Sequence, residues 1–194
     1  DIGLRLAQMP VISIALIRGR ARGIGSEIAL GCDMRFASIE NAILGQPEVG
    51  VGLVPGGGAM ERLPILIGRA RALEIVVGAD DFDATTAERY GWINRALPDS
   101  HLDGFVLGLA QRIATFDKQA IAAAKRIINR DAVPSAEKLK ESQATFAQAF
   151  AWPGTRARGK RCLELGMDKP GDFEMRFGAS LPILGIEASQ GDLM

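Results

Sequence analysis

The sequence has few of the residues on which nucleophilic and metal chemistry depends. Its 194 residues include one histidine, His101, and two cysteines, Cys32 and Cys162, which lie far apart in the chain. One histidine leaves little for a Ser-His-Asp or Cys-His site, and a metal site built from His and Cys lacks ligands. Two distant cysteines are too few for a secreted disulfide framework, so we expect a reducing, cytoplasmic location and no metal site.

The chain also lacks an excess of either charge and any long apolar run. Lys plus Arg and Asp plus Glu both number 23, so the formal net charge is zero and no overall field favours nucleic acid or an anionic membrane. No apolar run approaches the roughly 18 residues that a membrane span needs. Apolar residues make up 47% and charged residues 24% of the chain. These values are typical of a soluble globular protein, and we expect neither nucleic acid nor membrane as a partner.

Short strands and helices alternate in the first half, which predicts an α/β protein. Residues 11–17 form a nearly continuous, β-branched apolar run, the pattern of a strand buried on both faces. The glycines of residues 19–25 then break the strand, and residues 26–32 are expected to form a short helix. Further along, the pattern predicts strands over 33–38 and 42–45, a glycine-rich stretch over 50–58 and a helix near Met60.

From Arg69 onward the sequence is mostly helical, apart from a predicted strand at residues 92–97. Thr85 and Glu88 have the spacing of a capping box, which predicts that a helix begins there. Three later helices are predicted from apolar residues that recur on one face. Their apolar residues are Leu102, Phe105, Val106, Leu109, Ala110 and Ile113 in the first, Ile121, Ala124, Ile127 and Ile128 in the second, and Leu139, Phe146 and Phe150 in the third.

Two glutamates beside glycine turns are the best candidates for chemistry. The dinucleotide pattern that starts at Gly23 fails because Ile28 occupies the place of its third glycine, and no phosphate-binding P-loop is present. Glu27 lies in the first turn of the predicted helix, next to the backbone N–H of Ile24, which is placed to stabilise an oxyanion. Glu48 lies in a second turn, over residues 45–50. Each glutamate taken alone is more often a solvated surface charge.

Two segments resemble the enoyl-CoA hydratase/isomerase (crotonase) family. Residues 19–33, GRARGIGSEIALGCD, are similar to that family's oxyanion turn and helix, and residues 43–58, ILGQPEVGVGLVPGGG, resemble its second catalytic loop. The order and the spacing also match. The resemblance extends from about Pro10 to Asn129, and the tail after Trp152 departs from a typical hydratase.

The resemblance implies a crotonase-like spiral of β-β-α turns over residues 1–98 and a helical region over 99–194 that builds homotrimers or hexamers. It implies hydration of a trans-2-enoyl-CoA thioester to the 3-hydroxyacyl thioester with no cofactor beyond the coenzyme A of the substrate. By the same resemblance, Glu27 and Glu48 are the catalytic pair and Ile24 supplies an oxyanion N–H. The implied substrate-binding residues are Ala21, Gly23, Gly25, Pro55 and Gly56.

Three features differ from the family pattern. The family's N-terminal segment, which supplies a second oxyanion N–H and much of the CoA pocket, is absent from this sequence, so the chain alone is expected to be feeble or inactive. Ile24 stands where the family usually has a small residue, and a β-branched residue does not readily take positive φ. Arg20 and Arg22 flank the turn, where they either meet CoA phosphates or are solvated, and solvation is the favoured interpretation.

Three alternatives remain open at this point. Double-bond isomerisation by one glutamate is the nearest. A non-catalytic oligomeric protein that keeps the fold is the second. Nucleic-acid binding through Arg18, Arg20, Arg22 and the basic run 156–161 ranks last, because aromatic residues are not interleaved with the arginines.

Overall fold

The computed structural model describes residues 2–186, whose six strands form two three-stranded sheets. The first sheet has the order β1-β3-β6 and the second β2-β4-β5. The strands are β1 Ile14–Ile17, β2 Arg20–Arg22, β3 Met34–Ser38, β4 Ile43–Gly45, β5 Asp81–Asp83 and β6 Arg95–Leu97. The expected mixture of short strands and helices is confirmed.

Two consecutive β-β-α units build this core. The first consists of β1, β2 and helix α2 (Ile24–Gly31). The second consists of β3, β4 and, after the 3₁₀ turn η1 (Val49–Val51), helix α3 (Ala59–Ile67). Each unit gives its first strand to one sheet and its second strand to the other, and equivalent strands pair in parallel.

The pairing of β2 with β4 brings the two glycine turns together. Arg22 lies opposite Gly45 in this parallel pair, and each is the last residue of its strand. Both strands therefore end at the same level in the sheet. β5 then pairs antiparallel with β4 and places Asp81 opposite Gly45. Because neighbouring strands lie only ~4.8 Å apart, the residues that follow β2 and β4 must lie close to one another.

The centre of the core is formed by residues from both halves of the spiral. Leu44 of β4 and Leu63 of α3 are fully buried, as is Ile75 of helix α4 (Arg69–Gly78). Trp92 is also fully buried and packs edge-on against Phe82 of β5. This packing fixes α3 and α4 against the sheet that carries the two turns.

Helix α5 (Ala84–Tyr90) begins two residues earlier than the predicted capping box requires. Its N-cap is Asp83, whose Oδ1 accepts a hydrogen bond of 2.6 Å from the Thr86 N–H. The Thr85–Glu88 box is therefore wrong, because Thr85 already lies inside the helix. The Thr86 N–H also holds the pKa of Asp83 below its usual range.

Removal of this cap should destabilise the protein modestly. We expect Asp83→Ala to lower the free energy of unfolding by about 1 kcal/mol, since the Thr86 N–H loses its acceptor. Thr85→Ala is the matched control and should change it by less than ~0.5 kcal/mol, because Thr85 is exposed. Urea denaturation of both variants makes the comparison, and equal losses would contradict the assignment of Asp83 as the cap.

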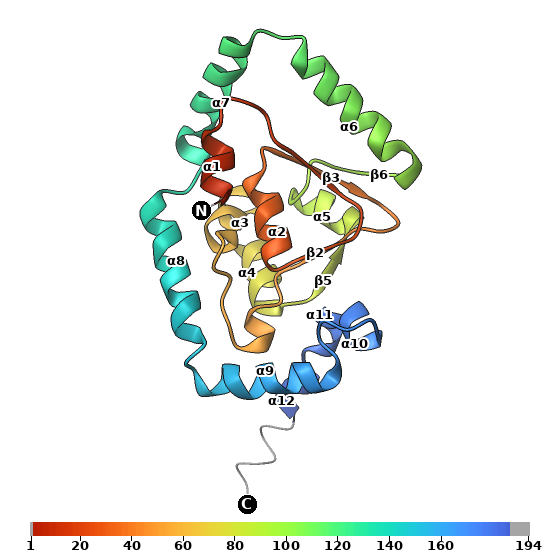
Figure 1. The fold of residues 1–194 in the computed structure, drawn as a ribbon, viewed down its shortest axis with the longest axis vertical. Helices are drawn as coiled ribbons and strands as arrows, with labels where there is room; N and C mark the ends of the chain where they lie inside the picture. The colour runs from red at the N-terminus through yellow and green to blue at the C-terminus, as the bar shows by residue number, and fades with distance from the viewer. Residues whose placement is uncertain (1, 187–194) are drawn as a thin grey trace, which may run out of the picture.

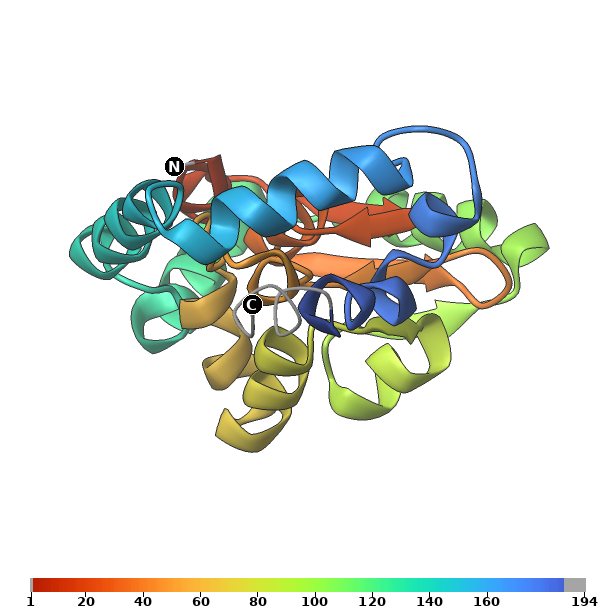
Figure 2. The ribbon, with the colours of Figure 1, turned by 90° about the horizontal axis from the view of Figure 1, so that it is seen from below.

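The remaining helices surround the core in chain order. Figure 1 shows α6 to α9 following one another around the periphery, with α10 and α11 beside β5, and Figure 2 shows α9 crossing one face of the molecule. Their bounds are α1 Ile2–Gln8, α6 Asp99–Ala114, α7 Lys118–Ala132, α8 Ala136–Ala149, α9 Pro153–Leu165, α10 Asp172–Met175, α11 Phe177–Ser180 and α12 Ile183–Ile186. In the part of the chain that the structure describes, no strand follows Leu97, and the division at residue 98 stays a prediction.

Burial within this chain differs from the expectation at β1 and at α7. The apolar run 11–17 is not buried on both faces: Val11, which precedes β1, and Leu16 of β1 are exposed, and β1 is an outer strand of its sheet in the described residues. Within this chain the predicted apolar face of α7 is left uncovered, since Ile127 and Ile128 are 55% and 69% exposed. The face of α6 does pack, with Leu102 and Val106 against Phe36 of β3.

Candidate active site

The first turn places a backbone N–H at the start of α2. Gly23 has φ 50° and donates its N–H to the Gly45 carbonyl at 3.0 Å, and its own carbonyl accepts the Glu27 N–H. Ile24 is the first residue of α2, so its N–H has no acceptor within the helix. Gly23 rather than Ile24 takes the positive φ, and the β-branched residue is therefore accommodated without strain.

Glu27 reaches from α2 to the N-terminus of α3. Its Oε1 accepts hydrogen bonds from the N–H groups of Gly57 at 2.7 Å and Ala59 at 3.1 Å. The N-cap of α3 is Gly58, which has no side chain, so Glu27 supplies the missing cap. The side chain is buried, and burial raises its pKa although both N–H groups favour the carboxylate.

Glu48 is the residue before η1 and is buried, with 9% of its surface exposed. Burial, with a smaller contribution from the charge of Glu27, raises its pKa to about 7. Its Oε2 has no hydrogen-bond partner among residues 2–186. Near neutral pH this carboxyl group can therefore either accept or release a proton.

Two glycines allow the carboxylates to approach the backbone. A Cβ at Gly23 would lie 2.9 Å from Glu48 Oε1, and a Cβ at Gly57 would lie 2.5 Å from Glu27 Oε2. Real Cβ atoms do not approach so closely. Any side chain at Gly23 or Gly57 would therefore displace a glutamate.

Both glutamates and Ile24 line one cavity of about 620 Å³. Gly56 lines it as well, whereas Ala21 and Gly25 line a neighbouring hollow of about 420 Å³. Of the other implied substrate-binding residues, Gly23 lies against Glu48, and Pro55 is fully buried. The cavity wall also includes Ile2, Gly3, Ile28, Gly57, Gln143 and Phe146.

Sequence reasoning missed the contribution of α8 to this cavity. Phe146 was expected only as part of an amphipathic helix face, and Gln143 was not singled out. Gly56 lies so close to Phe146 that a Cβ there would be 2.7 Å from the ring. The glycine run 56–58 was the available signal, because such a run often marks a close approach between backbone and side chain.

Arg22 is not solvated, contrary to the favoured interpretation. Only 9% of its side chain is exposed, and its guanidinium pairs with Asp81, at 2.6 Å from Nε to Oδ1. Arg20 is exposed, and its Nε lies 3.4 Å from the Met175 carbonyl. The two arginines that flank the first turn therefore have different environments.

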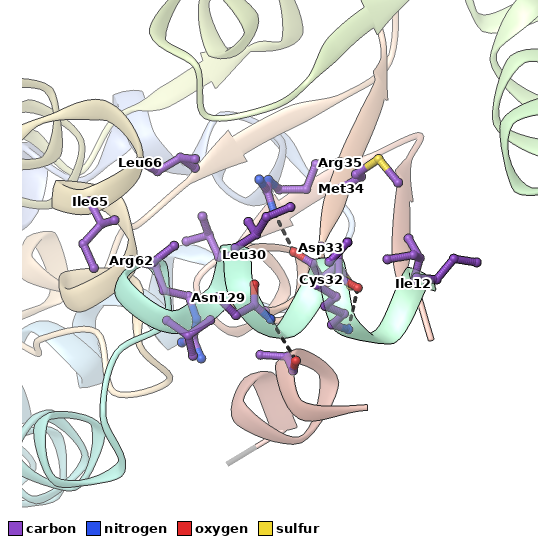
Figure 3. A pocket seen from close by; sticks show the side chains of 18 of the residues that line it. Ile12, Leu30, Cys32, Asp33, Met34, Arg35, Arg62, Ile65, Leu66 and Asn129 are labelled. Carbon is purple, nitrogen blue, oxygen red and sulfur yellow. Dashed lines mark hydrogen bonds and ion pairs between the residues drawn. The ribbon is translucent and has the colours of Figure 1, made fainter. Parts of the chain in front are cut away.

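A second cavity, of about 660 Å³, lies between α7 and α3 and is mostly apolar (Figure 3). Asp33 at its wall forms an ion pair of 2.7 Å with the buried Lys125, and it also accepts the Ser13 N–H. Asn129 donates to the Ala7 carbonyl. These polar groups join α7 to α1 and to Asp33, which directly precedes β3, so their evident role is structural.

The cavity lined by Glu27, Glu48 and Ile24 contains two buried carboxyl groups beside the N-terminus of α2. Such a site can move a proton with one carboxyl group, stabilise a negative oxygen at the Ile24 N–H, and move a second proton with the other. In the described residues, no three His, Cys, Asp or Glu side chains lie close enough together to hold a metal ion. The geometry therefore favours acid–base chemistry on a substrate that develops an oxyanion.

Comparisons with known proteins place this site in a family. The model of the enoyl-CoA hydratase/isomerase family matches residues 2–159. A protein named probable enoyl-CoA hydratase from Rhizobium meliloti (strain 1021) is 37% identical over 139 residues, which are 71% of this chain and 54% of that protein. The short-chain-enoyl-CoA hydratase of Clostridium acetobutylicum is 39% identical over 127 residues, 66% of this chain and 48% of the relative.

The fold is matched by solved structures as well. A crystal structure assigned as an enoyl-CoA hydratase from Streptomyces avermitilis has a TM-score of 0.91 and 47% identity, and the match covers 94% of this chain and 66% of that one. The chain belongs to the enoyl-CoA hydratase/isomerase family, and the expected crotonase fold is confirmed. The chain spans about half the length of the curated relatives it matches.

Proposed function

We propose that this protein, in its complete form, adds water to a trans-2-enoyl-CoA thioester and releases the 3-hydroxyacyl thioester. The observation that carries the proposal is the pair of buried glutamates, Glu27 and Glu48, in one cavity with the Ile24 N–H. The names of the hydratase relatives support the same reaction. The thioester would lie with its carbonyl oxygen at the start of α2.

The two glutamates divide the work according to their surroundings. The N–H groups of Gly57 and Ala59 favour the ionised form of Glu27, so Glu27 accepts the proton of the attacking water. The water oxygen bonds to C3, the π pair of the C2–C3 double bond forms a double bond between C1 and C2, and the carbonyl π pair moves onto the thioester oxygen to give an enolate. Glu48, whose pKa is about 7, supplies the proton that then bonds to C2. The enolate collapses to the thioester, and water is thereby added without a redox step. Proton exchange with solvent then returns Glu27 to its ionised form and Glu48 to its protonated form before the next turnover.

The Ile24 N–H stabilises the enolate oxygen. An N–H at the first turn of a helix is fixed before the reaction, so no reorganisation is needed as charge develops. Loss of one such donor typically costs ~10²–10³ in rate. The position of Ile24 beside both glutamates thus couples charge stabilisation to proton transfer.

Double-bond isomerisation is the second candidate, and one observation favours it. Glu27 Oε1 is held by two backbone N–H groups, whereas Glu48 Oε2 meets no partner among the described residues. A single carboxylate with an oxygen free of hydrogen bonds suits an isomerase, in which Glu48 would take a proton from C2 of a 3-enoyl thioester and return it to C4. The double bond would then move from C3 to C2.

Product analysis separates the two reactions. We expect the complete protein to convert crotonyl-CoA to 3-hydroxybutyryl-CoA, followed by loss of the enoyl absorbance and by mass spectrometry. A 3-enoyl-CoA that yields the 2-enoyl isomer, together with crotonyl-CoA that stays unhydrated, would establish the isomerase instead. Turnover of neither thioester would favour the non-catalytic alternative.

Assembly and location remain predictions. A homotrimer or hexamer is consistent with the exposed apolar residues Ile127 and Ile128 of α7, and size-exclusion chromatography with light scattering tests it. No helix within residues 2–186 is long and apolar enough to cross a membrane.

A further inference from the structure

An ion pair joins the strands from which both active-site turns depart. Arg22, the last residue of β2, contacts Asp81 of β5 through two parallel bonds, at 2.6 Å from Nε to Oδ1 and 2.5 Å from Nη2 to Oδ2. Gly45 of β4 lies between them, and a Cβ there would be 3.3 Å from Asp81 Oδ1. The ion pair therefore crosses β4 at Gly45. It lies just before the point where β2 continues to Ile24 and β4 continues to Glu48.

The C-terminal helices close over this ion pair. Arg22 Nη1 donates to the Glu174 carbonyl at 2.8 Å, and Nη2 donates to the Met175 carbonyl at 3.2 Å. The Gly178 N–H lies 3.3 Å from Asp81 Oδ2. Both members of the pair are thus bound by backbone groups of α10 and α11, which Figure 1 shows beside β5.

The same C-terminal segment also holds the Glu48 turn. Thr155 of α9 donates its hydroxyl to the Gly52 carbonyl, and Arg158 Nη1 donates to the Gly50 carbonyl at 3.2 Å. Leu181 packs so closely that a Cβ at Gly50 would lie 2.5 Å from its Cδ1. In Figure 2, α9 runs across the segment that carries η1, the turn that directly follows Glu48.

We propose that residues 155–181, the C-terminal clamp, hold the Ile24 turn and the Glu48 turn at a fixed distance from each other, with Arg22 as the positioning residue. Arginine suits this role because its planar fork can bind a carboxylate and further carbonyls at once. The match to the family model ends at residue 159, so α10 and α11 lie beyond it. The expected effect on turnover rests on the proposed function, whereas the effect on backbone motion does not.

A glycine pair provides a matched test. A Cβ at Gly178 would lie 2.5 Å from the Asp81 backbone nitrogen, so Gly178→Ala should push α11 away from β5. Gly154→Ala is the control, because a Cβ there meets nothing within 4 Å and Gly154 lies outside the clamp. Hydrogen–deuterium exchange of the complete protein should show about tenfold faster exchange over residues 22–27 and 48–53 in Gly178→Ala, and no change there in Gly154→Ala.

Steady-state kinetics give the second readout. Displaced turns should lower kcat about tenfold or more with KM changed less than about threefold, since misplacement by ~1 Å costs up to ~10² in rate. Faster exchange confined to residues 155–181, with unchanged exchange in both turns, would overturn the clamp while leaving the proposed function intact. Faster exchange in the turns of a protein that never hydrates crotonyl-CoA would support the clamp and count against the proposed function.

Arg22→Lys tests the same idea if Gly178→Ala does not fold. Lysine keeps the positive charge but cannot form two parallel bonds to Asp81 while also binding the two carbonyls. We expect faster exchange over residues 22–27 and a lower kcat. Unchanged exchange and unchanged kcat in Arg22→Lys would contradict a positioning role for Arg22.

Discussion

Glu48→Gln is expected to lower kcat for crotonyl-CoA hydration by about 10²–10⁴-fold, the usual contribution of a positioned acid or base. Glutamine has nearly the same shape, but it cannot release a proton to C2. KM should change little, because the amide still fills the same place beside Gly23. Stopped-flow or steady-state measurement of enoyl absorbance with the complete protein provides both constants.

Comparing the pH dependence of hydration by Glu48→Gln with that of the unmodified protein gives a more specific test. Because Glu48 must be protonated to act as the acid, hydration by the unmodified protein should fall as pH rises through about 7. Glu48→Gln should lose this limb of the profile. Glu88→Gln, which alters an exposed glutamate outside the cavity, should leave both the rate and the profile unchanged. A Glu48→Gln rate within about threefold of the original would remove Glu48 from the chemistry.

The sequence was informative wherever a residue's role depends on its near neighbours. Three features of the site are local: the glycine turn at Gly23, the short helix after it and the second turn at Glu48. Their glycines, and the carboxylate in the first turn of the helix, can be recognised from the sequence alone. The pairing of β2 with β4 then brings the two glutamates into one cavity, while their catalytic roles stay a prediction. The family resemblance supplied the link that residue patterns alone left open.

Long-range contacts were beyond sequence reasoning. Arg22 was interpreted as solvated because arginines are mostly exposed, but its partners Asp81 and Glu174 lie 59 and 152 residues away. No local pattern marks such a pairing. In the same way, an apolar run predicted a fully buried β1, although an edge strand with Leu16 exposed has the same composition. Which face is covered depends on elements that periodicity does not specify.

A second effect of Glu48→Gln concerns stability, and it has the opposite sign to the loss of activity. Burial raises the pKa of Glu48 from 4.5 to about 7, so the folded state holds a proton that the unfolded state has already lost between these values. Stability contributed by this group is therefore complete below about pH 4.5 and decreases as pH rises to about 7. At ~1.4 kcal/mol per pKa unit, the loss amounts to roughly 3 kcal/mol, and it stays constant at higher pH.

Glutamine at position 48 carries no charge at any of these pH values, so the variant avoids that loss. We expect the free energy of unfolding of Glu48→Gln to exceed that of the original protein by up to ~3 kcal/mol at pH 8 and to differ little from it at pH 5. Urea denaturation at both pH values measures the two differences, with exposed Glu88→Gln as the control whose difference should not change with pH. A Glu48→Gln protein that is less stable than the original at pH 8 would mean that the carboxylate is stabilised by its surroundings, and Glu48 would then be poorly suited to release a proton at neutral pH.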